Sequence, residues 1–116
     1  FESAIDLLSY QTLLEKNGCQ EELKAHFISL GGVEKLVLDH YLKYHKDIKK
    51  ITLCLDNDEE GRKACKRLAM DFGQSYLVSR HKPKAKDFNM ELTEMLEEEK
   101  QMKKEMQQES LGKEIL

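Results

Sequence analysis

The feature that most constrains the fold of this chain is a short apolar run that ends in a cluster of acids, "ITLCLDNDEEGRKACKRL". Ile51, Leu53, Cys54 and Leu55 make up the apolar run, which is typical of a parallel strand covered on both faces. Asp56 and Asp58 follow at once, and Gly61 precedes a helical pattern that closes at Gly73. Neither a buried strand nor an amphipathic helix needs carboxylates at the junction between them, so this junction is a candidate metal site.

The rest of the chain alternates between helical and strand-like patterns. Helical stripes are expected at 4–16 and 33–45, and a last helical segment starts at about Asn89. Two further apolar runs, "AHFISLGG" and "SYLVS", predict short strands. The alternation predicts an α/β fold with a small parallel sheet of about four strands flanked by helices, in a Rossmann-like arrangement. Because a helical pattern begins almost directly after Phe1, the first strand is expected to be largely missing from the chain.

Charge is unevenly distributed along the sequence. The total of −3 does not indicate a nucleic-acid or membrane binder, but residues 1–87 carry +1 and residues 88–116 carry −4. Length and this shift predict one module at 1–98 and a charged C-terminal helix or disordered tail at 99–116. Met102 and Met106 extend a thin apolar stripe into the tail, so a helix docked on the domain or on a partner is the alternative.

The cysteines and the hydropathy pattern indicate in which cellular compartment the chain is expected. Cys19, Cys54 and Cys65 form no C-x-x-C pair, which argues against a disulfide framework and a structural zinc site. There is no run of 18 apolar residues and no basic-then-apolar signal segment. The chain is therefore expected to be cytoplasmic, in a reducing compartment, and to have no membrane partner.

Asp56 and Asp58 lie where an open parallel sheet gathers its functional groups, beyond the carboxyl end of a strand. Such oxygen donors suit Mg²⁺, which uses few protein carboxylates and keeps sites for water and phosphate. Gly61 would let the backbone approach closely. An EF-hand loop is a poor alternative because its twelfth position, which requires Glu, is Arg67. Helix capping accounts for one acid of "DNDEE", but not for all four.

Glu2 is a second unusual acid. If the missing first strand ends at Phe1, Glu2 occupies the same place after that strand as Asp56 occupies after its own. Adjacent parallel strands lie about 4.8 Å apart, so the two carboxylates would share one site. Taken alone, a Glu near a chain end is usually only solvated, and its pairing with the D-x-D motif is what favours the metal interpretation.

At these residues the sequence resembles the Toprim domain shared by bacterial-type primases, type IA and type II topoisomerases and some nucleases. The family pattern is a Glu after the first strand and a D-x-D after the third, here Glu2 in "FESAIDLLS" and the two acids of "LDNDEEGRKA". Arg62 after Gly61 is more similar to the primase form than to the topoisomerase form. "ISLGG" and "KAKDFNMEL" resemble Toprim-like domains of plasmids and mobile elements. The resemblance covers residues 1 to about 94.

The resemblance implies a Mg²⁺-dependent nucleotidyl or phosphoryl transfer on nucleic acid, primase-like or DNA-nicking, with Mn²⁺ as a substitute. Asp56 and Asp58 would be catalytic metal ligands and Glu2 a further ligand or the general acid/base. Asp87 would add a fourth carboxylate, unless it is an ordinary loop acid that starts the last helix. DNA is the expected partner. The cations expected to hold its backbone, unless they only solvate the surface, are Arg62, Lys66, Arg80, Lys82, Lys84 and Lys86.

The chain also departs from the enzymes it resembles. A topoisomerase needs a tyrosine nucleophile, and a primase needs template-binding and usually zinc-binding parts. The four tyrosines, Tyr10, Tyr41, Tyr44 and Tyr76, lie in helix or strand patterns. The chain is therefore interpreted as a module of a larger DNA-replication protein. Two alternatives stay open, a non-catalytic module that binds Mg²⁺ and DNA in a mobile-element or replication protein, and an interaction domain that uses the Met-bearing tail.

Overall fold

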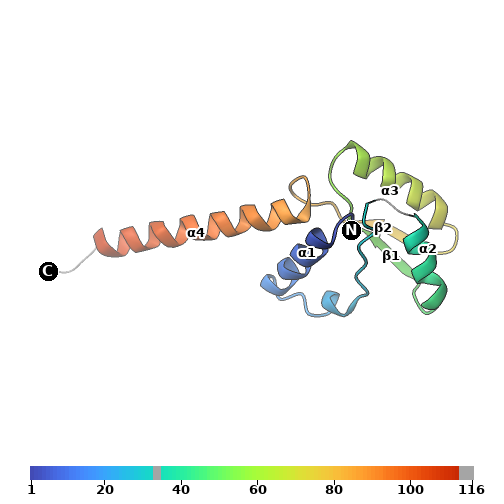
Figure 1. Ribbon diagram of the computed structural model, residues 1–116. Coiled ribbons are helices and arrows are strands. Elements are labelled where there is room, and N and C mark those ends of the chain that lie inside the picture. The colour runs from blue at the N-terminus through green and yellow to red at the C-terminus, as the bar shows by residue number, and fades with distance from the viewer. Residues whose placement is uncertain (33–34, 113–116) are drawn as a thin grey trace.

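Figure 1 shows the computed structural model, which describes residues 1–32 and 35–112. Strands β1 (Lys50–Leu53) and β2 (Leu77–Arg80) form a parallel sheet, and α3 (Glu59–Phe72) connects them. The ladder places Lys50 opposite Leu77 and Leu53 opposite Arg80. The other elements are α1 (Ala4–Lys16), a short 3-10 turn η1 (Glu22–Lys24), α2 (Lys35–Tyr44) and α4 (Phe88–Gly112).

The α/β class with a small parallel sheet flanked by helices is confirmed, but the sheet is smaller than expected. Only β1 and β2 are strands in the described part of the chain, where the sequence predicted about four. The apolar run "AHFISLGG" is extended, and its backbone contact is with the first two residues of the chain. The N–H of Leu30 donates to the carbonyl of Phe1 at 2.8 Å, and that of Gly32 donates to the carbonyl of Glu2 at 2.8 Å. This pairing is too short to form a strand.

The main core lies between the sheet, α2 and α3. Leu55, two residues after β1, and Ala64 on α3 are fully buried, because the small Ala64 side chain lets the helix pack closely on the sheet. Leu68 and Phe72 extend the same face of α3 at helical spacing, and Leu42 closes the core from α2. The expected amphipathic patterns of these helices are therefore the packing surfaces of the fold.

A second, smaller core joins α1 to the start of α4. Leu13 of α1 and Phe88 of α4 pack on Cys54, which follows β1. The Phe88 ring also meets Tyr10 edge-on at 4.9 Å between ring centres. Outside this core, Lys16 and Glu99 form an ion pair at 3.1 Å between α1 and α4. These contacts fix the amino end of α4 beside the carboxyl end of β1.

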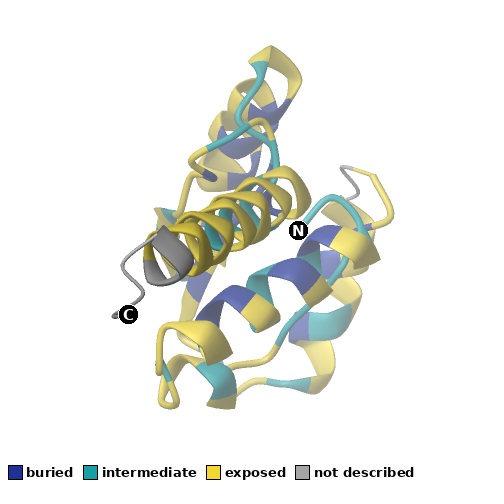
Figure 2. Ribbon diagram, turned by 90° about the vertical axis from the view of Figure 1, so that its left-hand side faces the viewer, coloured by how far each residue is buried: buried dark blue, intermediate teal, exposed yellow. Residues whose placement is uncertain are grey.

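Helix α4 projects away from the rest of the molecule (Figure 1), which gives the structure extents of 69 × 30 × 19 Å. Figure 2 colours most of the α4 ribbon as exposed, and residues 100–109 are exposed without exception. The helix passes through the expected boundary at residue 98, so the separate module and tail stay a prediction, and residues 113–116 lie outside the described part. Within that part, no helix is both long and apolar enough to cross a membrane.

Candidate metal centre

Asp56 holds the central position at the carboxyl end of β1. The buried Cys54 and Leu55 anchor the chain just before it, and α3 begins three residues after it. Gly61, in the first turn of α3, lies against the Asp56 backbone: a Cβ at Gly61 would overlap the Asp56 carbonyl oxygen and lie 2.8 Å from its carbonyl carbon. The close approach expected from the glycine is therefore present, and a side chain at this position would push Asp56 away from α3.

Asp58 is the N-cap of α3. Its Oδ1 accepts a hydrogen bond of 2.7 Å from the Gly61 N–H, and its backbone is extended, as the cap position requires. The capping role considered for this acid is therefore real. The cap uses one carboxylate oxygen, and the second oxygen stays available to a ligand at the same junction.

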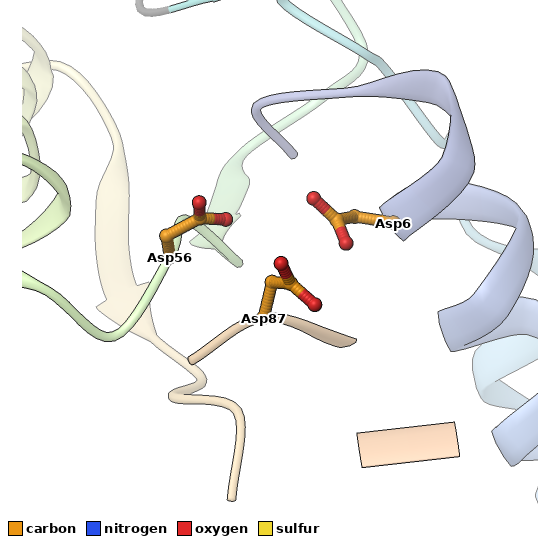
Figure 3. A group of neighbouring side chains, drawn as sticks. All are labelled: Asp6, Asp56 and Asp87. Atoms are coloured by element: carbon orange, nitrogen blue, oxygen red, sulfur yellow. The ribbon is translucent and has the colours of Figure 1, made fainter. Parts of the chain in front are cut away.

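Three aspartates from distant parts of the sequence converge beside this junction (Figure 3). Asp6 comes from the first turn of α1, Asp56 follows β1, and Asp87 directly precedes α4. One ligand atom from each lies within 4.8 Å of the other two. The structure thus brings together two of the predicted ligands, Asp56 and Asp87, and adds Asp6. Glu2 and Asp58 are close neighbours of this cluster but not members of it.

Asp6 is the acid that the sequence did not identify. It lies on the buried face of α1, three and seven residues before Ser9 and Leu13, which are also buried. A carboxylate on the apolar stripe of a helix is unusual unless it has hydrogen-bond or metal partners. The place of Asp6 on this stripe was therefore the feature of the sequence that could have identified it. Its Oδ2 accepts from the Ser3 hydroxyl at 2.8 Å, and its Oδ1 accepts from the Asn89 N–H at 3.1 Å.

The amino end of α4 is where two of these acids meet. Asp87 accepts a 2.7 Å hydrogen bond from the Met90 N–H, so both Asp87 and Asp6 satisfy N–H groups in the first turn of α4. The alternative interpretation of Asp87, an acid that starts the last helix, is therefore supported by this hydrogen bond, and its role as a metal ligand stays a prediction. Asp56 differs, because the hydrogen bonds of the described residues give its carboxylate no helix N–H partner.

Glu2 lies within electrostatic reach of the same acids. Burial, a hydrogen bond to Asp56, and the nearby charges of Asp56, Asp58 and Asp6 raise the pKa of Glu2 to about 7. Burial also raises the pKa of Asp56; the hydrogen bond with Glu2 opposes this increase, and the charges of Asp6, Asp87 and Asp58 add to it. Carboxylates with raised pKa values repel one another when ionised. A bound cation would relieve this repulsion.

The donor set fits a hard divalent cation. Carboxylate oxygens are the ligands that Mg²⁺ prefers, and oxygens on opposite sides of an ion with bonds of about 2.1 Å lie about 4.2 Å apart. The ligand atoms of Asp6, Asp56 and Asp87 lie within 4.8 Å of one another. Small rotations of the side chains would therefore bring them into bonding distance.

The loop between β2 and α4, residues 81–87, carries three of the predicted cations. Asn57, the middle residue of the D-x-D motif, connects this loop to the acidic junction through hydrogen bonds. Its N–H donates to the Lys86 carbonyl at 2.6 Å, and its side chain donates to the Pro83 carbonyl at 3.5 Å. The side chains of Lys82, Lys84 and Lys86 are exposed on this loop. The sequence analysis predicted no role for Asn57. Its side-chain amide, which can donate a hydrogen bond to a neighbouring loop, was the feature that could have indicated one.

The helix side of the site carries two exposed cations. Arg62 and Lys66 lie one turn apart on α3, as their spacing predicted. Arg80 is placed differently from the other predicted cations. It is half-buried at the end of β2, and its Nη2 donates to the Asp56 carbonyl at 3.2 Å. Its Nε is buried without a partner among the described residues. In this structure Arg80 positions the backbone of Asp56.

The α/β fold with acids gathered at the carboxyl end of a parallel strand is the arrangement of a Toprim-like domain. The sequence profile of the Toprim-like family matches residues 1–92, and the chain belongs to this family. It is also similar to an uncharacterized protein of Bacillus anthracis, 38% identical over 74 residues, which cover 59% of this chain and 20% of that protein. The chain therefore spans about a fifth of that relative's length. No solved structure matches the chain.

Proposed function

We propose that this chain is the Toprim module of a DNA-processing protein and supports a Mg²⁺-dependent nucleotidyl or phosphoryl transfer on nucleic acid. The observation that carries the proposal is the convergence of Asp6, Asp56 and Asp87, with Glu2 and Asp58 beside them. These acids come from four places in the sequence, and elements that pack against one another hold them together. Membership of the Toprim-like family supports the same function.

Each acid has a separate role in this proposal. Asp56 is the central metal ligand, since its carboxylate is the one without a helix N–H partner among the described residues. Asp6 and Asp87 are further ligands from the α1 and α4 side, and Asp58 offers the oxygen that its cap leaves unused. When bound, Mg²⁺ would stabilise charge on phosphate oxygens and orient the attacking group, with Mn²⁺ as a substitute. Glu2 lies against Asp56 and holds or releases a proton there.

The exposed cations supply the contact to the nucleic-acid backbone. Arg62 and Lys66 lie on α3 directly after the acidic junction, and the Asn57 hydrogen bonds hold the loop of Lys82, Lys84 and Lys86 beside it. A strand that lies between these two groups would pass over the acids. Binding through phosphates predicts an affinity that falls steeply with salt and depends little on base sequence.

Calorimetric titration of Mn²⁺ and Mg²⁺ tests the metal site. Asp56→Asn should lose binding, because it removes the charge of the central ligand and keeps its size. Asp39→Asn is the matched control, since Asp39 is an exposed acid on α2, and it should bind as the parent chain does. Equal metal binding by the Asp56→Asn variant and the parent chain would contradict the assignment.

The alternative is a module that binds Mg²⁺ and DNA without chemistry of its own. One observation favours it: Tyr10, on the same face of α1 as Asp6, is a poor nucleophile, because burial raises its pKa to about 12. Its hydroxyl lies 2.9 Å from Nδ1 of His81. Magnesium-dependent nicking or primer synthesis by the purified chain, lost in Asp56→Asn, would exclude this alternative. DNA binding with neither activity would support it.

A further inference from the structure

Tyrosine and histidine rings gather on α2 and beside it, near the amino end of β1. On one row of the helix, the ring centres of His40 and Tyr44 lie 5.1 Å apart. On the neighbouring row, the rings of Tyr41 and His45 are stacked, with 4.1 Å between their centres and 21° between their planes. His26, from the segment before α2, places its ring centre 5.2 Å from that of His45. These five rings form one group, the ring cluster.

The ring cluster is ordered and at the same time open to solvent. The His26 Nδ1 lies 2.6 Å from the Tyr41 hydroxyl, and this hydrogen bond fixes the orientation of the inner rings. Tyr44 is 73% exposed, and His40 and His26 are exposed as well. The core already has its contact with α2 through Leu42, on another face of the helix. The outer rings therefore contribute little to the core and stay available to a ligand.

Lysines lie next to these rings. Residues 40–50 contain four lysines and a single acid, Asp47, which gives a net charge of +3. All four lysines are exposed, and among the described residues none of them pairs with an acid; they are Lys43, Lys46, Lys49 and Lys50. The dipole at the carboxyl end of a helix favours cations in the last turn, which accounts for Lys43. The other three follow α2 in the turn that leads into β1, so helix stability does not explain them.

A surface hollow of about 540 Å³ adjoins the ring cluster at His40. Leu36 and Val37 give the hollow an apolar wall, and Asp39 and Lys43 also line it. Leu36 is 74% exposed, so apolar surface lies open beside a cation. This combination suits a ligand that is flat and apolar in one part and anionic in another.

The ring cluster and its lysines are separate from the metal centre. Lys50 is the first residue of β1, whereas Asp56 follows the carboxyl end of that strand. The four residues of β1 span about 13 Å. Figure 1 shows α2 and the start of β1 on the side of the domain away from α4, whose amino end lies at the acids. A ligand held at this surface would therefore not occupy the acid cluster.

We propose that the ring cluster and the four lysines bind a single strand of nucleic acid, whose bases stack on the exposed rings and whose phosphates contact the lysines. Bases in a duplex already stack on one another, so this surface selects single strands. Every base has an aromatic face, so binding depends little on base sequence. The inner rings are already ordered, which lowers the entropic cost of binding. The proposal shares with the proposed function a nucleic-acid partner, but it needs neither the acids nor a metal.

Fluorescence anisotropy of a labelled oligothymidylate of about 12 nucleotides, measured with the full chain in EDTA, tests the proposal. Tyr44→Leu should weaken binding about fivefold or more, because it removes a stacking face at an exposed position. Tyr44→Phe keeps the ring and should bind as the parent chain does. Lys46→Gln should also weaken binding and reduce the slope of log affinity against log salt by about 0.7. Lys104→Gln, on the exposed part of α4, is the matched control and should change neither.

Two further measurements separate this surface from the metal centre. Asp56→Asn should bind the oligothymidylate at least as tightly as the parent chain, so a failure of the metal assignment would leave this proposal intact. A duplex of the same length should bind equally to the parent chain and to Tyr44→Leu, because its bases offer no free face.

Four outcomes would overturn the proposal. The first is a parent chain that does not bind the oligothymidylate, and the second is equal binding by Tyr44→Leu and the parent chain. The third is weaker binding in Lys46→Gln alone, which would indicate a site for anions without stacking. The fourth is weaker binding in Lys82→Met with none in Tyr44→Leu, which would place the strand at the metal centre. Unfolding temperatures equal to that of the parent chain would show that each variant is folded.

Discussion

Gly61→Ala is the substitution whose effect the structure determines most directly. The added methyl would overlap the Asp56 carbonyl oxygen and lie 2.8 Å from the carbonyl carbon, where ordinary contact begins at 3.4 Å. The first turn of α3 and the end of β1 must therefore separate by at least about 0.6 Å, and by more to clear the oxygen. Both partners are backbone, so no rotamer change relieves the overlap.

Two free-energy terms act in opposite directions in this variant. Alanine favours the helix over glycine by about 0.5–1 kcal/mol. Forced overlap in a packed region typically costs about 1–3 kcal/mol, and a backbone clash belongs at the upper end of that range. We therefore expect a net loss of about 1–2 kcal/mol in the free energy of unfolding, although the same substitution in an open helix would stabilise it.

Metal binding at the proposed site should respond more strongly than the free energy of unfolding does. Ligand distances tolerate errors of only about 0.2 Å, so a shift of Asp56 by several tenths of an ångström should weaken Mn²⁺ binding at least tenfold. Urea unfolding measures the first effect and calorimetry the second. Glu60→Ala, at the exposed neighbouring position, is the control for a new alanine in this turn. A Gly61→Ala chain as stable as the parent, with unchanged Mn²⁺ affinity, would refute the close-approach argument.

Three further predictions follow from single contacts. Asp58→Asn should keep the cap on α3 and weaken metal binding, whereas Asp58→Ala should in addition lose about 1 kcal/mol of stability, as urea unfolding and calorimetry would show. Arg80→Met should remove the donor to the Asp56 carbonyl, lower stability by about 1–2 kcal/mol and weaken Mn²⁺ binding; Lys82→Met should leave both unchanged and reduce only DNA affinity. Burial raises the pKa of Cys54 from 9.0 to about 11, so the stability that its thiol form contributes is complete below pH 9 and is lost as pH rises through 11. Urea unfolding at pH 8 and 10.5 should show a loss on the order of 1–2 kcal/mol that is smaller in Cys54→Ala.

The sequence predicted local features of the site better than distant ones. Asp56, Asp58 and Gly61 lie within one strand-to-helix junction, where strand end, cap and close approach follow from nearest neighbours in the chain. The position of Asp6 in the cluster could not be predicted from neighbouring residues, because it depends on α4 packing beside α1. Its hydrogen-bond partner Asn89 is 83 residues further along the chain. The same limit applies to Arg80, whose charge suggested DNA contact and whose hydrogen bond to Asp56 depends on how β1 and β2 pair.

An apolar run alone does not determine whether a segment forms a strand, as the two runs near the sheet show. The run "AHFISLGG" has strand-like composition, but a strand also requires a neighbour with free backbone groups along its length. Here the backbone partners of the run are Phe1 and Glu2, which bond to Ile28, Leu30 and Gly32 at one end of it. Lys50–Leu53, within the apolar run that ends at Leu55, forms a strand because β2 runs alongside it.

The projecting helix α4 has a mechanical consequence for the acids. A helix of 25 residues, such as α4, is about 37 Å long. The N–H groups in its first turn donate hydrogen bonds to the carboxylates of Asp6 and Asp87. The ion pair of Lys16 and Glu99 lies part of the way along it and is the contact farthest from the acids described between α4 and α1. A small tilt imposed at the far end by anything that grips α4 would therefore turn into a displacement at the acid cluster. A partner that contacted the exposed part of α4 would in this way act on the acid cluster at its amino end.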